Sequence, residues 1–143
     1  IAARELAAAR VVLGWESACF QQRSLVGVEG GAVGPGNVVT IDVECEHVTA
    51  VFIGFGEVKV RAEDVASRAA RAAAAWLESE VAVDEHLADQ LLLPMALAGR
   101  GAFTTVAPTG HTKTQAALLR QLLGAQVAIE RVSERAWQIE VSA

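Results

Sequence analysis

The stretch of sequence that decides the fold is residues 85–99, which read EHLADQLLLPMALAG. A polar start gives way to an apolar run, and this pattern predicts a helix over residues 83–98 that Pro94 kinks or breaks. The elements predicted after it are a turn at residues 99–101, a strand over 102–106, a helix over 111–123 that Gly124 stops, and a hairpin of 126–132 and 135–141. Residues 81–143 are therefore predicted to follow the order α-β-α-β-β.

The preceding residues predict a second block of the order α-β-β-β-α. Residues 37–46 alternate, and we expect the buried face of this strand to carry Val39, Ile41, Val43 and Cys45. The other predicted elements are a helix over residues 1–13 ending at Gly14, a strand over 18–25, a glycine-rich loop over 27–36, a strand over 48–55 and a helix over 62–80. Together the two blocks predict an α/β chain of the α+β class.

The composition limits the classes of protein that fit. The chain has 143 residues, 52% of them hydrophobic and 20% charged, enough to bury a core in one domain or two small ones. A net charge of −5 gives no bulk attraction for nucleic acid, so phosphate binding must be local. Two cysteines are too few for a disulfide framework and favour a cytoplasmic location, and no apolar run is long enough to cross a membrane. The chain opens without Met, as though inside a helix, so we expect a fragment of a longer protein.

His111 is the first candidate functional residue, because it stands where a helix begins. Unpaired N–H groups at such a position favour phosphate, and neutral imidazole is the form that attacks phosphorus. Thr112 and Lys113 add phosphate contacts in this interpretation. The alternative is structural: Thr109 caps the helix, Lys113 is solvated and His111 is a surface residue.

A second candidate group lies on the predicted helix over residues 83–98. His86, Asp89 and Gln90 share one face, and a carboxylate with an amide can recognise ribose hydroxyls and a base edge. The alternative is an ordinary solvated helix face, with charge at the helix start matching the helix dipole. Two potential ligands fall short of a closed zinc site. The glycine-rich residues 27–36 precede a strand and lack Gly-Lys-Ser/Thr, which excludes a phosphate loop.

These motifs give the chain a family resemblance. Residues 85–99, then Phe103-Thr104, then residues 111–114 (HTKT) closely resemble the C-terminal part of RNA 3′-terminal phosphate cyclases. Residues 1–6, residues 34–37 (GPGN) and Gly56-Glu57 agree in order, so the resemblance covers essentially the whole chain. One departure is Gln115, which stands where many relatives carry Asn.

The resemblance implies a domain organisation. The family is built from three repeated β-α-β-α-β-β units, with a small insert domain of a mixed sheet and helices in the third. Residues 1–80 correspond to that insert domain without its first strand. Residues 81–143 correspond to the C-terminal part of the third repeat. We therefore expect this chain to interact with the remaining N-terminal part of the same protein. The protein can also be expected to form a homodimer.

The resemblance also implies an activity. The family uses ATP, with Mg2+ or another divalent metal, to convert an RNA 3′-phosphate end into a 2′,3′-cyclic phosphate. The adenylylated histidine matches His111, and the segment that lines the ATP site matches His86, Leu87, Ala88, Asp89 and Gln90. Two alternatives are a non-catalytic cyclase-like protein that acts as an interaction factor in ribosome biogenesis, and a small binding module that works alone.

Overall fold

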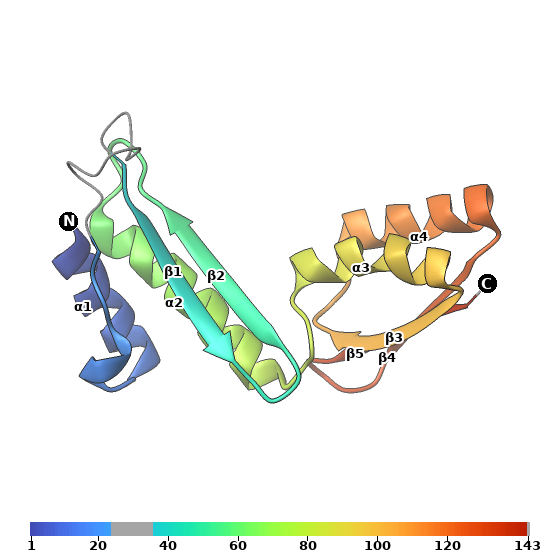
Figure 1. Ribbon diagram of the computed structural model, residues 1–143, viewed down its shortest axis with the longest axis horizontal. Coiled ribbons are helices and arrows are strands. Elements are labelled where there is room, and N and C mark those ends of the chain that lie inside the picture. Colours follow the sequence, from blue (N-terminus) through green and yellow to red (C-terminus); the bar gives the residue numbers. More distant parts are fainter. Residues whose placement is uncertain (24–35, 143) are drawn as a thin grey trace. The chain divides into compact units, whose positions relative to one another are not determined.

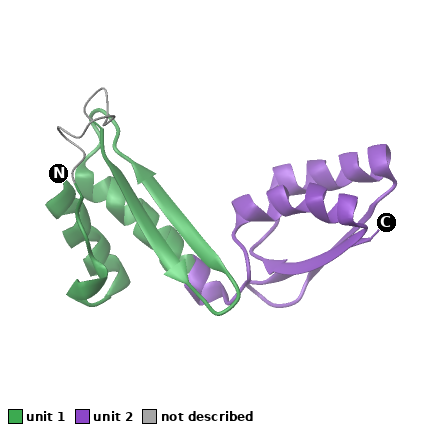
Figure 2. Ribbon diagram, viewed as in Figure 1, with its two compact units in different colours: residues 1–75 green, residues 76–143 purple. Residues whose placement is uncertain are grey.

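The computed structural model describes residues 1–23 and 36–142 and divides the chain into two compact units (Figure 2). Unit 1 comprises residues 1–75 and unit 2 comprises residues 76–143. The described residues form four α-helices and two antiparallel sheets, so the predicted α+β class is confirmed. The α-helices and strands are α1 (Ala2–Leu13), β1 (Val38–Glu44), β2 (Thr49–Phe55), α2 (Ala62–Ser79), α3 (Glu85–Ala98), β3 (Arg100–Thr105), α4 (Gly110–Leu123), β4 (Gln126–Arg131) and β5 (Trp137–Ser142). Among these described helices, none is both long and apolar enough to span a bilayer.

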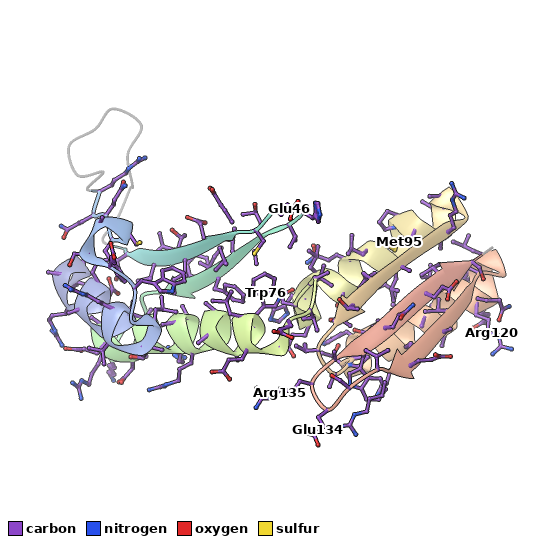
Figure 3. All side chains as sticks on the ribbon, turned by 90° about the horizontal axis from the view of Figure 1, so that it is seen from below. Glu46, Trp76, Met95, Arg120, Glu134 and Arg135 are labelled. Carbon is purple, nitrogen blue, oxygen red and sulfur yellow. The ribbon has the colours of Figure 1, made fainter. Side chains whose placement is uncertain are left out.

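In unit 1, strands β1 and β2 form an antiparallel hairpin that lies along α2 (Figure 1). The predicted alternation is confirmed for Val39, Ile41 and Val43, which are buried between exposed neighbours. The prediction is wrong for Cys45, which is exposed because β1 ends at Glu44 and the chain turns there. Glu46 marks this turn in Figure 3.

Small residues allow α2 to approach the hairpin closely. Its buried face consists mainly of alanines, and a Cβ atom added to Gly54 of β2 would lie 3.1 Å from both the carbonyl oxygen and Cγ1 of Val65. The buried residues on α2 that precede position 76 are Val65, Ala66, Ala69, Ala70 and Ala73. A two-stranded sheet is marginal alone, so this contact is what gives the hairpin a core.

The strand predicted over residues 18–25 is wrong where the structure describes it. Residues Ser17–Cys19 form a 3₁₀ turn, and residues 20–23 are not in a strand. Positions 17–19 are all exposed, so this segment has no face buried against a sheet. Residues 24 and 25 and nearly all of the predicted glycine-rich loop, residues 27–35, lie outside the described residues.

Unit 2 is a three-stranded antiparallel sheet with β5 between β3 and β4, and α3 and α4 lie together on one face of it (Figure 1). The order α-β-α-β-β predicted for residues 81–143 is confirmed. Leucines of the two helices and alternate residues of the strands make the core. Its buried members include Leu92, Leu119, Phe103, Ile139 and Val141.

Two details of α3 differ from the prediction. The helix continues through Pro94 to Ala98, so the break is not seen. Pro94 and Gln90 are both exposed, so the Gln90 carbonyl that Pro94 cannot bond is near solvent. The helix also begins at Glu85 rather than residue 83, because Val83 and Asp84 form other contacts with the rest of unit 2.

Glycines set the turns of unit 2. Gly99 and Gly124 end α3 and α4 in the left-handed conformation, with φ of 81° and 71°. Gly101 is required for a different reason, because a Cβ atom there would overlap the side chain of Met95 on α3 (Figure 3). The turn predicted over residues 99–101 is shorter than expected, because β3 already begins at Arg100, and Gly101 lets this strand pack directly against α3.

An ion pair ties α1 to α2 and predicts a pH dependence. The Arg4 guanidinium donates two hydrogen bonds of 2.7 Å to the two carboxylate oxygens of Glu63, and these bonds lower the pKa of Glu63 from the usual 4.5 to about 2. A carboxyl group whose pKa is lower in the folded state stabilises that state at pH values above its unfolded pKa. We therefore expect this contribution to be complete above about pH 4.5 and lost as the pH falls towards 2.

Carboxyl NMR titration of Glu63 measures this directly. Arg4→Met should return the pKa of Glu63 towards 4.5. Arg10→Met is the matched control, since Arg10 is exposed on the same helix and forms no ion pair with any described residue. Titration of Glu63 near pH 4.5 in the unaltered protein would show that the pair does not form.

Candidate functional site

The candidate site is built on the junction between the start of α3 and the end of β3. The Val83 N–H donates to the Thr104 carbonyl at 3.1 Å, and Val83 forms a parallel bridge with Thr105. The Thr105 hydroxyl, which is fully buried, donates to the Asp84 carbonyl at 3.3 Å. Because α4 starts shortly after β3, these bonds place the N-termini of α3 and α4 at the same end of unit 2 (Figure 1).

The start of α4 is open to an anion. The Thr109 side chain caps the helix by accepting from the Thr112 N–H at 3.3 Å, and the Thr109 carbonyl accepts from Lys113 at 3.2 Å. Among the described residues, no acceptor bonds the N–H groups of Gly110 and His111. The first turn contains no acidic residue. Free N–H groups and the positive end of the helix dipole therefore favour a phosphate here.

The start of α3 differs in its electrostatics. One carboxylate oxygen of Asp84 accepts from the N–H groups of His86 and Leu87, at 3.1 and 2.7 Å. Glu85 adds a second negative charge in the first turn. This helix end already holds an anion of its own, so a ligand phosphate is favoured at α4 and disfavoured at α3.

The predicted site residues occupy these two helix starts. His111 and Lys113 are exposed in the first turn of α4. The Thr112 side chain is fully buried and shares a 3.2 Å hydrogen bond with the Thr109 hydroxyl. A phosphate contact by Thr112 would have to compete with that bond, so its predicted role stays a prediction.

The residues predicted to line an ATP site lie in the first turns of α3. His86 and Gln90 are exposed, and Nε2 of His86 lies 3.7 Å from a carboxylate oxygen of Glu85. Asp89 and Leu87 are partly buried, whereas Ala88 is fully buried in the core. The helix therefore offers two polar side chains to a ligand at this end, Asp89 and Gln90, with His86 beside them. Their roles, like that of His111, stay predictions.

The described residues do not provide a set of side-chain ligands for a divalent metal. Within residues 1–23 and 36–142, no group of three or more His, Cys, Asp and Glu side chains is placed to bind one ion. A metal bound by this part of the chain would need ligands from a phosphate or from elsewhere.

The structural interpretation of Thr109 is confirmed, since its side chain caps α4. Asp84 caps α3, a role that the predicted helix start at residue 83 did not give it. Capping does not compete with the interpretation of His111 as a nucleophile, because the Thr109 cap leaves the His111 side chain exposed. Sequence reasoning missed Thr105. A threonine near the end of a predicted strand gives no local signal that its hydroxyl holds the start of a helix about 20 residues earlier.

The cap predicts a measurable loss of stability. Thr109→Ala removes the acceptor for the Thr112 N–H and should lower the free energy of unfolding by about 1 kcal/mol. Thr109→Ser keeps the hydroxyl and should lose much less. Chemical denaturation of the three proteins measures both changes. Equal losses in the two variants would mean that the hydroxyl does not cap α4.

The fold and the site together define an α+β protein with an exposed histidine at an anion-accepting helix start. Comparison with known proteins identifies its family. A family model described as RNA 3′-terminal phosphate cyclase matches residues 35–129. The chain belongs to this family.

Relatives called RNA 3′-terminal phosphate cyclase share much of the sequence. Identity is 44% over 124 residues with the protein of Pseudomonas aeruginosa, covering 87% of this chain and 35% of the relative. It is 39% over 142 residues with that of Ectopseudomonas mendocina, covering 99% and 40%. It is 50% over 99 residues with that of Ralstonia nicotianae, covering 69% and 28%. The chain thus spans at most two fifths of the length of these relatives.

Proposed function

We propose that this chain is part of an enzyme that uses ATP to convert an RNA 3′-phosphate into a 2′,3′-cyclic phosphate. The observation that carries the proposal is the start of α4, where His111 is exposed beside two N–H groups that no described residue bonds. Membership of the cyclase family supports it. Such an enzyme is a ligase that forms a phosphoric ester bond.

In the proposed reaction, a ring nitrogen of His111 attacks the α-phosphorus of ATP. A P–N bond forms, the bond to the bridging oxygen breaks, and pyrophosphate leaves with the electron pair. AMP then passes from His111 to an oxygen of the RNA 3′-phosphate. The neighbouring 2′-hydroxyl attacks the activated phosphorus, loses its proton and expels AMP. The open N–H groups of α4 and Lys113 would stabilise charge that develops on phosphate oxygens.

In the same proposal, α3 recognises the nucleoside. Its first turns present Asp89 and Gln90, whose carboxylate and amide suit ribose hydroxyls and a base edge, with His86 beside them. Leu87 and Ala88 would contribute through backbone and packing, since Ala88 is fully buried. Mg2+ or another divalent metal belongs to the proposed reaction, but the described residues do not form a site for it, and no step is assigned to it.

The remaining parts of the proposal concern organisation. We assign residues 1–80 to an insert domain and residues 81–143 to the end of a third repeat. The rest of such a cyclase would complete the ATP and RNA sites. We also propose a homodimer as a form of the complete protein. Two free, exposed cysteines suit the reducing cytoplasm, where we place the protein.

The proposed role of His111 is tested with the complete cyclase that contains this chain. Incubation with ATP labelled in the α-phosphate should give an acid-labile protein adenylate. His111→Ala removes the nucleophile, so we expect labelling to fall below detection. His47→Ala is the matched control, because His47 is also an exposed histidine, in the turn of unit 1, and should label normally. Normal labelling of His111→Ala would refute the assignment.

The runner-up function is a non-catalytic cyclase-like protein in ribosome biogenesis. The exposed imidazole at the start of α4 favours the enzyme over this alternative. Incubation of the complete protein with ATP and a 3′-phosphorylated oligoribonucleotide separates the two. A cyclic phosphate end supports the enzyme, whereas no product with Mg2+ or Mn2+ would favour the interaction factor.

A further inference from the structure

The two threonines at the end of β3 hold the segment that leads into α3. The Thr104 hydroxyl accepts from the Ala82 N–H at 3.0 Å, and the Thr104 carbonyl accepts from the Val83 N–H at 3.1 Å. The Thr105 hydroxyl donates to the Asp84 carbonyl at 3.3 Å. Three consecutive residues are thus bonded to two threonines that follow them 21 or 22 positions later in the chain.

Asp84 extends this attachment into α3. Its carboxylate accepts from the N–H groups of His86 and Leu87, and its carbonyl accepts from the Ala88 N–H at 3.1 Å. The Thr105 hydroxyl bonds that same carbonyl. The first turn of α3 is therefore tied to the last residue of β3 through a single peptide group.

The fold itself does not need these hydroxyl groups. The Thr105 side chain is fully buried, and a valine side chain of nearly the same shape would fill its space without the cost of burying a hydroxyl. The Asp84 carbonyl would keep its bond from Ala88, so no buried acceptor would lose its last partner. The Thr104 hydroxyl is similar, because its partner Ala82 is exposed and the Ala82 N–H can bond water instead. Both hydroxyls are thus better explained by a role in positioning than by one in stability.

The end of β3 also fixes the start of α4. Thr109, which caps α4, comes soon after Thr105 in the chain. The Thr112 side chain is fully buried and shares a hydrogen bond with the Thr109 hydroxyl. The helix start that carries His111 is therefore anchored in the core, and the starts of both helices are held by the same end of β3.

The relative placement of these helices matters for the proposed reaction. His111 must attack the phosphorus of an ATP molecule whose nucleoside lies on α3. A displacement of about 1 Å can slow such an attack by roughly 100-fold. We propose that Thr104 and Thr105 are positioning residues, whose hydroxyls hold Asp89 and Gln90 at the correct distance from His111. This inference rests on the proposed function, and it assigns neither threonine a contact with ATP.

The test is a single-turnover measurement on the complete cyclase with saturating ATP labelled in the α-phosphate. Each progress curve gives a rate constant for adenylate formation and an amplitude, which is the fraction of enzyme labelled. Thr105→Val should lower the rate constant by about tenfold or more, with little change in the amplitude or the melting temperature. Thr105→Ser keeps the donor and should recover most of the rate. A purely structural role would lower the amplitude instead, because less of the enzyme would be folded.

A second variant tests the other hydroxyl. Thr104→Val removes the acceptor for the Ala82 N–H and should also lower the rate constant, at an unchanged amplitude. Thr40→Val is the matched control, since Thr40 is an exposed threonine of β1 in unit 1 and should label at the normal rate. If Thr105→Val fails to fold, the comparison of Thr104→Val with Thr40→Val decides.

The possible outcomes separate this inference from the proposed function. Slower labelling at full amplitude in Thr105→Val, with recovery in Thr105→Ser, supports the inference. Normal rate constants in Thr104→Val and Thr105→Val would overturn it, and so would an equal slowing in Thr40→Val. A lower amplitude at a normal rate constant would show that the threonines serve only the fold. If the proposed function is wrong, the unaltered cyclase forms no adenylate, or His111→Ala still forms one.

Discussion

The parallel bridge between Val83 and Thr105 is the constraint on which the rest of the site depends. It fixes the residues just before α3 against the end of β3, and the buried Thr105 hydroxyl adds a bond to the Asp84 carbonyl. The chain leaves β3 at that same point and starts α4 soon afterwards. This one contact therefore places the starts of two helices at the same end of unit 2, and this explains how segments distant in the sequence contribute to one site.

The two helix starts differ in charge, and this difference suits them to different parts of a ligand. Asp84 satisfies the first N–H groups of α3 with its own carboxylate, which leaves the side chains of the next turns to recognise an uncharged part of a ligand. The start of α4 has a neutral cap, no acidic residue and a lysine, which suits phosphate. This asymmetry is a physical reason to assign phosphate chemistry to His111 and nucleoside recognition to the α3 side chains.

Much of the fold could be predicted because its signals are local. Alternation located the buried Val39, Ile41 and Val43, and glycines located the ends of α1, α3 and α4. The errors have equally physical causes. The strand predicted over residues 18–25 pairs with no strand in the part of the chain that the structure describes, and Cys45 continues an alternation beyond the point where β1 ends. The helix passes Pro94 because the unpaired carbonyl lies on an exposed part of α3.

The residues of the candidate site could be predicted from the sequence, but the hydrogen bonds that hold the site together could not. The motif around His111 and the shared face of His86, Asp89 and Gln90 are visible in the sequence. The hydrogen bond from the Thr105 hydroxyl to the Asp84 carbonyl is not, because it joins residues that are far apart in the chain. Long-range hydrogen bonds leave no periodic pattern, so only the folded structure shows them.

The central claim is that the histidine at the start of α4, and not the neighbouring lysine, carries AMP. The most direct test is mass spectrometry of the complete cyclase after reaction with ATP, digested at neutral or alkaline pH to preserve a phosphoramidate. The account predicts that the peptide containing residues 110–114 gains the mass of AMP, that fragmentation places it on His111, and that brief acid treatment removes it. An acid-stable adduct on Lys113, or AMP on a residue elsewhere in the protein, would contradict the account.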